Sequence, residues 1–268
     1  MTLPLRAKHA LGQHFLRDES LLERMLDETP LKAGDSVFEI GPGLGNMTRV
    51  MARRAGRVLA LEIDKDLVPV LRTQFMLDKH VDVVEGDVMT ADLPQLLTPL
   101  GAFHVIANLP YYLTTPILTL LLQLPLPIKS ICVTVQTEAA RRVLAQPSSK
   151  EYGPLSLLAQ YRTQPRAAMN LPRRLFTPPP HVDSTFLVMP ALQQPPVQVQ
   201  NEAAFWRLVQ VSFAMRRKTL VNNLMSGYAF DRAQAQAWVQ AASLPATVRA
   251  EALTLKQFAA LDAACPNR

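Results

Sequence analysis

The sequence has few cysteines and no long apolar run, and these absences exclude several classes of protein. The two cysteines, Cys132 and Cys265, are too few for a disulfide framework or a cysteine zinc site. No stretch approaches the roughly 18 uninterrupted apolar residues that predict a membrane span. The first residues also lack the apolar run of a signal peptide. We therefore expect a cytoplasmic protein that contacts no membrane.

Charged residues are also scarce, and they are unevenly distributed. They make up 19% of the chain against 49% apolar residues, which is enough apolar material for a core and excludes a mostly disordered chain. Residues 1–92 hold 12 basic and 15 acidic side chains, whereas residues 93–268 hold 16 basic and 7 acidic ones. The net charge of +6 is therefore the sum of an acidic part, residues 1–92, and a basic part, residues 93–268. The basic excess indicates that the second part faces a polyanion.

Short apolar runs alternate with helical patterns from about residue 19 to residue 170. The expected strands cover residues 36–40, 57–63, 81–85, 103–107 and 130–136. Strands that alternate with helices at this spacing predict an α/β fold with a parallel sheet covered on both faces. Residues 182–189 alternate in polarity and predict a last strand, antiparallel at the end of the sheet.

The segment 190–200 is rich in Pro and Gln, carries no charge and predicts a linker. After it, helical patterns continue without any strand signal. We expect an α/β domain over residues 1–190 and a small all-α domain over residues 200–268.

A glycine-rich turn, GPGLG at residues 41–45, follows the first predicted strand and precedes a helix. Gly41 and Gly43 allow a tight turn and close approach of a ligand to the main chain. Glu62 ends the next strand, 21 residues after Gly41, where a carboxylate can accept hydrogen bonds from both ribose hydroxyls of a nucleoside. Asp87 follows the third strand and is placed to accept from an adenine amino group.

Two ligands, NAD and S-adenosylmethionine, fit a nucleoside site at the carboxyl ends of these strands. The G-x-G-x-G spacing is shorter than the dinucleotide fingerprint and favours the methyl donor. For the glycine loop taken alone, a plain strand–turn–helix with capping glycines is the alternative.

The turn after the fourth strand, Asn108-Leu109-Pro110-Tyr111, suits the activation of an aromatic amine. Such an amine is a poor nucleophile because its lone pair is delocalised into the ring. The Asn108 side-chain oxygen and a backbone carbonyl on the Pro110 side can hold its two N–H groups and direct the lone pair toward a methyl group. Tyr111 offers a stacking ring worth ~1–3 kcal/mol, which offsets part of the cost of extracting a base. A stiff turn in which Asn108 caps the next helix is the alternative.

With these motifs, the chain resembles the bacterial small-subunit (16S) ribosomal RNA adenine dimethyltransferases. The matching segments are LGQHFL (11–16), GPGLG (41–45), LEID (61–64), EGD (85–87), NLPY (108–111), FTPPPHVDS (176–184) and MRRKTL (215–220). The resemblance implies a Rossmann-like class I methyltransferase sheet followed by the helical domain. It also implies S-adenosylmethionine-dependent dimethylation of N6 on two adjacent adenosines near the 3′ end of the small-subunit RNA.

The resemblance further implies roles for individual residues. Residues expected to bind the cofactor are His14, Leu16, Gly41, Gly43, Glu62, Asp87, Val88 and Asn108. Residues expected at the target adenine are Asn108, Leu109, Pro110, Tyr111 and Phe176, with Tyr111 and Phe176 covering its two faces. The family has Asn where this chain has His14, and His can also donate and accept hydrogen bonds. No metal is expected, because a sulfonium methyl is already activated.

The basic residues Arg216, Arg217 and Lys218 of the matched MRRKTL segment are expected to contact RNA phosphates. Because proteins recognise RNA mainly by its shape and by splayed bases, the expected partner is an immature 30S-type particle rather than free adenosine.

Three other functions compete with this interpretation. Large-subunit rRNA adenine methyltransferases of the antibiotic-resistance type share the glycine loop and an Asn-x-Pro-Tyr motif, but FTPPPHVDS and RRKTL favour the small-subunit enzyme. A non-catalytic ribosome assembly factor with the same fold would not require an intact NLPY turn with Glu62 and Asp87. An NAD dehydrogenase is disfavoured by the glycine spacing.

Overall fold

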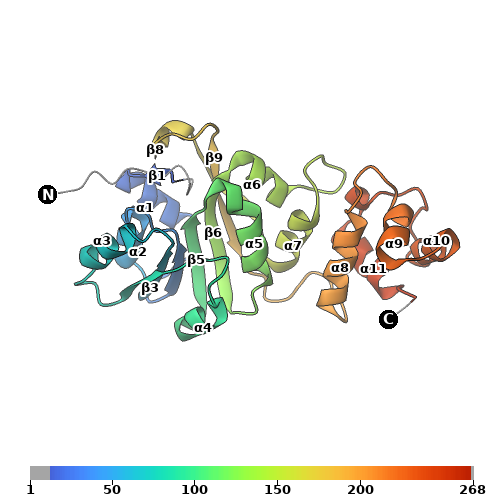
Figure 1. Ribbon diagram of the computed structural model, residues 1–268, viewed down its shortest axis with the longest axis horizontal. Coiled ribbons are helices and arrows are strands. Elements are labelled where there is room, and N and C mark those ends of the chain that lie inside the picture. The colour runs from blue at the N-terminus through green and yellow to red at the C-terminus, as the bar shows by residue number, and fades with distance from the viewer. Residues whose placement is uncertain (1–12, 267–268) are drawn as a thin grey trace. The chain divides into compact units, whose positions relative to one another are not determined.

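A computed structural model describes residues 13–266 of the chain, which form two compact units (Figure 1). The sheet unit comprises the described residues up to 140 together with 163–191, and the helical unit comprises 141–162 and the residues from 192 onward. From the sequence, residues 141–162 are expected in the first domain. This segment groups with the helical unit because its helix α7 (Pro154–Arg162) carries Tyr161, whose ring lies 5.2 Å from that of Trp206.

The sheet unit contains seven strands in the order β4-β3-β2-β5-β6-β9-β7. The parallel strands are β2 (Ser36–Ile40), β3 (Arg57–Glu62), β4 (Val81–Glu85), β5 (Phe103–Asn108) and β6 (Ile128–Gln136). β9 (Ser184–Pro190) is antiparallel to β6, and β7 (Arg166–Leu171) is antiparallel to β9. The predicted α/β architecture is confirmed.

The last predicted strand is antiparallel as expected, but it does not lie at the end of the sheet. β7, which the sequence analysis missed, occupies that edge. Phe186, Leu187 and Val188 of β9 are all fully buried, which fits a strand with a neighbour on each side. β7 was missed because its sequence, RAAMNL, is weakly apolar and only its last residue is fully buried.

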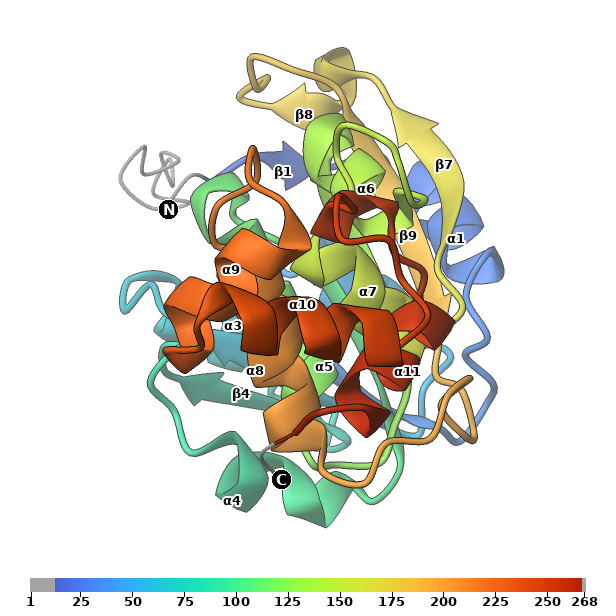
Figure 2. The same cartoon turned by 90° about the vertical axis from the view of Figure 1, so that its right-hand side faces the viewer.

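Helices cover both faces of the sheet. On one face, α1 (Glu19–Asp27), α2 (Asn46–Ala52) and α3 (Leu67–Gln74) share a core with Val37 of β2 and Ile106 of β5. Phe38 and Val105, which point to the opposite face, are equally buried. α5 (Thr114–Gln123) lies on that face (Figures 1 and 2). The short α4 (Leu93–Leu97) follows β4, and α6 (Thr137–Leu144) follows β6.

The strand order reverses beside β2, which pairs in parallel with both β3 and β5. Ile40 at the end of β2 lies in register with Leu61 and Ala107. Open α/β sheets bind ligands outside the carboxyl ends of the strands at such a reversal. The loops after β2, β3, β4 and β5 therefore meet where the sequence analysis expects the site.

A separate two-stranded sheet connects the start of the described chain to the FTPPP segment. β1 (Phe15–Leu16) is antiparallel to β8 (Phe176–Thr177), with Phe15 opposite Thr177 and Leu16 opposite Phe176. The first matched motif is thereby held against the sixth, although about 160 residues separate them.

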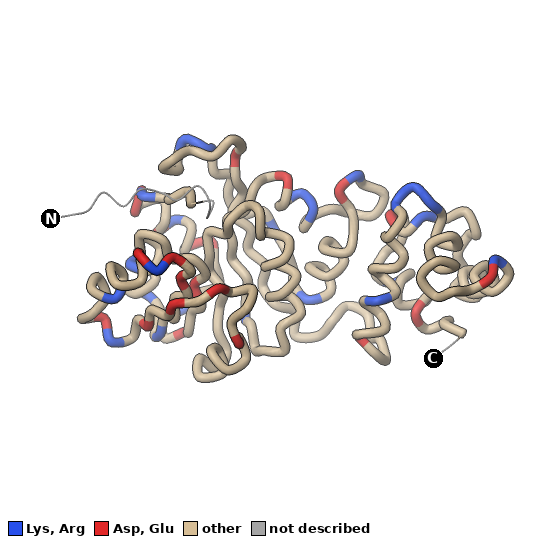
Figure 3. Tube along the Cα trace, in the orientation of Figure 1, with Lys and Arg blue, Asp and Glu red and all other residues tan. Residues whose placement is uncertain are grey.

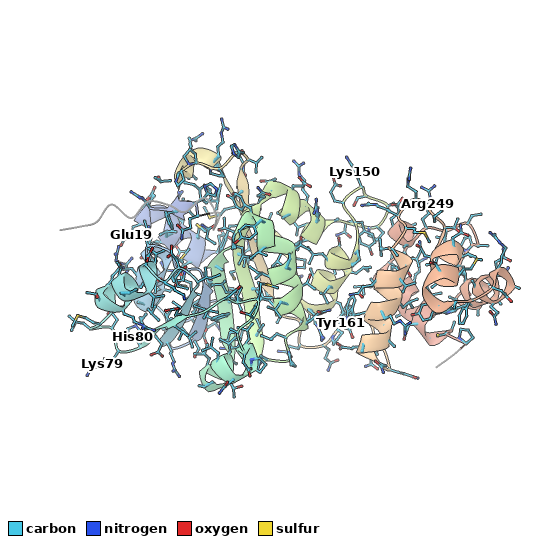
Figure 4. All side chains as sticks on the ribbon, viewed as in Figure 1. Glu19, Lys79, His80, Lys150, Tyr161 and Arg249 are labelled. Atoms are coloured by element: carbon cyan, nitrogen blue, oxygen red, sulfur yellow. The ribbon has the colours of Figure 1, made fainter. Side chains whose placement is uncertain are left out.

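The helical unit contains α7, α8 (Glu202–Ser212), α9 (Leu220–Tyr228), α10 (Arg232–Ala241) and α11 (Leu255–Ala263) (Figure 2). Side chains of Asn201, Thr219, Asp231 and Thr254 cap the last four at their N-termini. Tyr161, labelled in Figure 4, packs against Phe205 and Trp206. Within residues 13–266, no helix combines the length and apolarity that crossing a bilayer requires.

A partly buried polar cluster lies where β2, β5 and β6 begin, and its carboxyl group is expected to make stability depend on pH. Asp35 accepts hydrogen bonds from Lys129 and the Lys32 N–H and lies 3.1 Å from His104, whose other ring nitrogen contacts Ser130. Although burial opposes ionisation, these bonds lower the pKa of Asp35 from 3.8 to about 2. A depressed carboxyl pKa contributes stability above the unfolded value and loses it as pH falls.

We therefore expect the unfolding free energy of the wild type to fall between about pH 4 and pH 2, and Asp35→Asn to remove this part of the dependence. Urea unfolding over this pH range measures it. An Asp35→Asn variant with the same acid dependence as the wild type would contradict the assignment.

Candidate active site

The two expected cofactor glycines differ in what surrounds them. Gly41 has φ +67°, and a side chain built there would meet nothing within 4 Å. Gly43 has φ +59°, but a Cβ there would lie 2.7 Å from the ring of Phe15. Gly41 thus leaves space for a ligand beside the main chain. The missing side chain of Gly43 instead makes room for Phe15.

Glu62 ends β3 with its side chain only 3% exposed. One carboxylate oxygen accepts the Gly43 N–H at 3.0 Å and the other accepts the Asp64 N–H at 2.9 Å. Burial raises the pKa of Glu62, and these backbone hydrogen bonds oppose the rise. The carboxylate therefore joins the glycine loop to the end of the neighbouring strand.

The loop after β4 carries Asp87 and Val88, two further residues that are expected to bind the cofactor. Asp87 is half-buried and accepts the Met89 N–H at 2.9 Å, while Val88 is buried. Ile63 follows Glu62 and keeps 44% of its surface exposed. Ile63 is not among the site residues expected from the sequence, although an apolar residue directly after the strand-terminal carboxylate is a signal for an apolar ligand surface.

Glu39 is a second buried carboxyl group that the sequence analysis missed. It is 2% exposed, and the Thr48 hydroxyl donates to it at 2.6 Å. Burial, with the negative charge of Glu62 nearby, raises the pKa of Glu39 to about 8. Glu39 lines a small cavity of about 40 Å³ together with Leu16, Gly41 and Asn108. The available signal was a carboxylate inside the otherwise apolar strand SVFEI.

Asn108 ends β5 and has a fixed amide orientation. Its Nδ2 donates to the main-chain oxygen of His14 at 2.7 Å. Because a carbonyl only accepts hydrogen bonds, the amide nitrogen must face His14, and the side-chain oxygen must point to the other side. The acceptor predicted for the target amine is therefore the atom that points away from the His14 carbonyl.

Leu109 and Pro110 lie in the turn that follows β5. The Leu109 side chain is 2% exposed and belongs to the core. The Pro110 carbonyl accepts the Leu113 N–H at 3.1 Å, because a 3₁₀ turn over Tyr111–Leu113 begins there. The carbonyl on the Pro110 side that suits the target amine is therefore the one that precedes the proline, that of Leu109.

Tyr111 is half-buried, and its hydroxyl lies 2.8 Å from the Ser184 hydroxyl at the start of β9. Burial raises the pKa of Tyr111, so the phenol stays neutral. The contact joins the NLPY turn to the last residue of the FTPPPHVDS segment. Ser184, which is fully buried, was missed as a site residue even though it ends the second of these motifs.

The ring stacked on Tyr111 is not that of Phe176. Phe176 is 2% exposed and lies in the core shared with α1, because the β1–β8 pairing turns it inward. The expectation that Phe176 covers the face of the base opposite Tyr111 stays a prediction, and the structure shows Phe176 buried next to β1. His14 instead stacks on Tyr111, with ring centroids 5.3 Å apart and planes 22° apart.

The remaining residues of the first motif lie close to the glycine loop. The Leu16 side chain is 6% exposed and lines the small cavity, and its carbonyl accepts Asn46 Nδ2 at 2.9 Å. Leu11 and Gly12, which also belong to the motif, lie outside the described residues.

The basic segment of the helical unit divides into two kinds of side chain. Arg216 bonds to Glu251 at 3.3 Å and to the Lys150 carbonyl, so it holds the loop before α9. Arg217 and Lys218 are exposed. The whole unit has 12 basic and 5 acidic residues, and Figure 3 shows the basic excess along its trace. Figure 4 shows Lys150 and Arg249 extending from it into solvent.

Among residues 13–266, no three or more His, Cys, Asp or Glu side chains gather in a way that could hold a metal ion. The polar side chains at the carboxyl edge of the sheet include the buried carboxyls of Glu39, Glu62 and Asp64, the half-buried Asp87 and the oriented Asn108 amide.

The strand order, the glycine loop tied to a buried carboxylate and the Asn-Leu-Pro-Tyr turn define the fold and site of a methyltransferase. The model of the ribosomal RNA adenine dimethylase family matches residues 5–261. The chain belongs to this family, and it is therefore an enzyme that methylates adenine in ribosomal RNA.

Similar proteins extend over nearly the whole chain. Proteins from Geobacillus sp. and Bacillus licheniformis, both named ribosomal RNA small subunit methyltransferase A, are 39% and 40% identical over 95% of this chain and 90% of their own length. The crystal structure of the 23S rRNA methyltransferase ErmE matches with a TM-score of 0.70 and 25% identity, covering 94% of this chain and 99% of ErmE. A dimethyladenosine transferase from Plasmodium falciparum matches in fold, with a TM-score of 0.76 and 21% identity over 92% and 96% of the two chains.

Proposed function

We propose that the protein uses S-adenosylmethionine to dimethylate N6 of two adjacent adenosines near the 3′ end of small-subunit ribosomal RNA. The proposed substrate is an immature 30S-type particle in the cytoplasm, where such particles are assembled. The observation that carries the proposal is the Asn108 amide, whose nitrogen donates to the His14 carbonyl, so that its oxygen points away from that carbonyl at the end of β5, three residues before Tyr111. The small-subunit relatives at about 40% identity support the choice of RNA.

The residues at the carboxyl edge fit this cofactor. Gly41 leaves open space beside the main chain, and the buried Glu62 carboxylate suits ribose hydroxyls. The buried Glu39 carboxyl, with its raised pKa, suits an ammonium group, because a nearby cation would stabilise its ionised form. Asp87 and the exposed Ile63 would hold the adenine end.

When bound, S-adenosylmethionine supplies a methyl group that its sulfonium already activates. The protein contributes position and alignment. The Asn108 oxygen and the Leu109 carbonyl would accept the two N–H bonds of the target amine, while Tyr111 stacks on the base. No strong general base is needed, because the amine loses its proton only after attack.

Methylation of immature small subunits with a labelled donor, followed by mapping of the product bases, tests the proposal. The expected result is two adjacent dimethyladenosines near the 3′ end. Label in large-subunit RNA instead would indicate the resistance-type enzyme. Binding to particles without any transfer would indicate a non-catalytic assembly factor. Equal activity on naked RNA would contradict a particle substrate.

We expect the double variant Arg217→Ala/Lys218→Ala to bind small-subunit particles more weakly and with a shallower salt dependence. Removing one cation that pairs with a phosphate reduces the slope of log K against log salt by about 1. Filter binding at several salt concentrations measures this slope. The matched control is Arg232→Ala/Lys256→Ala, which removes two other exposed cations of the same unit. Equal slopes for both double variants would exclude the segment from the RNA interface.

A further inference from the structure

We propose that the His14 side chain is a place-holder for the target adenine. In the free enzyme the imidazole covers the stacking face of Tyr111, and the base replaces it there while the main chain of residues 13–16 stays bound. The proposal rests on the proposed function, because it takes Tyr111 as the platform for the base.

The ring contact is the first observation. A ring 5.3 Å from the centre of the Tyr111 ring and tilted by only 22° occupies a stacking position. A planar base cannot take the same face at the same time. His14 Nδ1 also lies 2.8 Å from the Pro178 carbonyl, within the FTPPP segment. The imidazole therefore stacks and makes an edge hydrogen bond, which are the two kinds of contact that a base makes.

The main chain around His14 is held by contacts that do not involve the imidazole. The His14 carbonyl accepts Asn108 Nδ2, and the Leu16 carbonyl accepts Asn46 Nδ2. Phe15 pairs with Thr177 in the β1–β8 sheet, and its ring packs on Gly43. Rotation about the side-chain bonds of half-buried His14 can remove the ring while these contacts remain.

This separation has a consequence for catalysis. The Asn108 amide keeps its orientation through the His14 carbonyl whether the ring is in or out, so the acceptor for the target amine is in place before the base arrives. The imidazole, in contrast, competes with any base for Tyr111. An adenosine held beside the site by a large docked RNA has a high effective concentration and displaces the imidazole from Tyr111. Free adenosine lacks this advantage and does not displace it. His14 thus favours substrates that are bound elsewhere on the enzyme.

The test compares three variants of the full-length protein that differ in the side chain at residue 14. His14→Ala and His14→Asn remove the stacking ring, and His14→Phe keeps one. The probe is a short single-stranded RNA that carries one 2-aminopurine between adenosines. The fluorescence of 2-aminopurine is quenched when this base stacks on an aromatic ring. We expect the Ala and Asn variants to bind it about 3- to 10-fold more tightly than the wild type, and the Phe variant to show no such gain. In a Tyr111→Leu background, removal of the ring is expected to change the affinity less than about 2-fold.

A second readout concerns the free wild-type protein. The His14 imidazole proton resonance is assigned as the one that disappears in His14→Asn. We expect the Tyr111 ring to shift this resonance. When the RNA probe is added, the resonance is expected to return toward the position of a free histidine. Thermal unfolding of each variant establishes that it is folded. Unchanged or weaker probe binding by both ring-less variants would overturn the proposal. Methyl transfer by the wild type to small subunits is measured in parallel, so that a failure of the proposed function is seen separately.

Discussion

Replacing Asn108 with alanine is expected to reduce methyl transfer by about two to three orders of magnitude, which is the usual cost of removing one precisely placed polar group at a reacting centre. The expected change in the dissociation constant of the cofactor is smaller, because Glu39, Glu62 and the glycine loop remain in place. A tritium transfer assay and calorimetry measure the two quantities. Equal losses in both would contradict a role at the target amine.

Asn108→Asp separates orientation from the mere presence of an acceptor. Aspartate keeps an acceptor oxygen but has a second oxygen in place of the amide nitrogen, so it cannot donate to the His14 carbonyl, which accepts Asn108 Nδ2 at 2.7 Å. We expect this variant to be impaired nearly as much as Asn108→Ala, because the acceptor is no longer fixed and a carboxylate is repelled by the carbonyl. Asn170→Ala is the matched control, since Asn170 is an exposed asparagine on β7. Wild-type activity of the Asn108→Asp variant would show that orientation by His14 is not needed.

The parts of the fold that could be predicted from sequence are those with local signals. β2, β3, β4, β5 and β6 are apolar runs between turn residues, and the structure contains all of them. β7 has no such signal, because its place at the sheet edge depends on pairing with β9. Residues 141–162 precede the predicted linker at 190–200, and the sequence pattern therefore places them in the α/β domain. Only the long-range packing of Tyr161 against Trp206 assigns them to the helical unit.

The same distinction applies to the site. Glu62 and Asn108 could be found because they end strands beside motifs of known chemistry. The packing of Phe15 on Gly43, the inward position of Phe176 and the stacking of His14 on Tyr111 could not, because each depends on the long-range β1–β8 pairing. Motif spacing along the chain contains no information about which of two aromatic rings turns toward the site.

Replacing Glu62 with glutamine is expected to raise the dissociation constant of the cofactor by about 10- to 100-fold, the range for losing a hydrogen bond to a charged group. Glutamine has nearly the same shape but only one acceptor atom. Both carboxylate oxygens of Glu62 accept backbone N–H groups, from Gly43 and Asp64. The amide NH₂ of glutamine must therefore face one of these donors, which displaces either the glycine loop or the turn at Asp64, and the charge offered to the ribose is lost.

Calorimetry with the cofactor measures this loss, and transfer at saturating cofactor is expected to recover most of the wild-type rate, because the site of the target amine is untouched. Glu85→Gln is the matched control, since Glu85 ends the adjacent strand β4 with an exposed side chain. Burial raises the pKa of Glu62, so cofactor affinity is also expected to fall as the pH is lowered and the carboxylate is protonated. The glutamine variant should lose this part of the pH dependence, and an unchanged dissociation constant would exclude Glu62 as the ribose ligand.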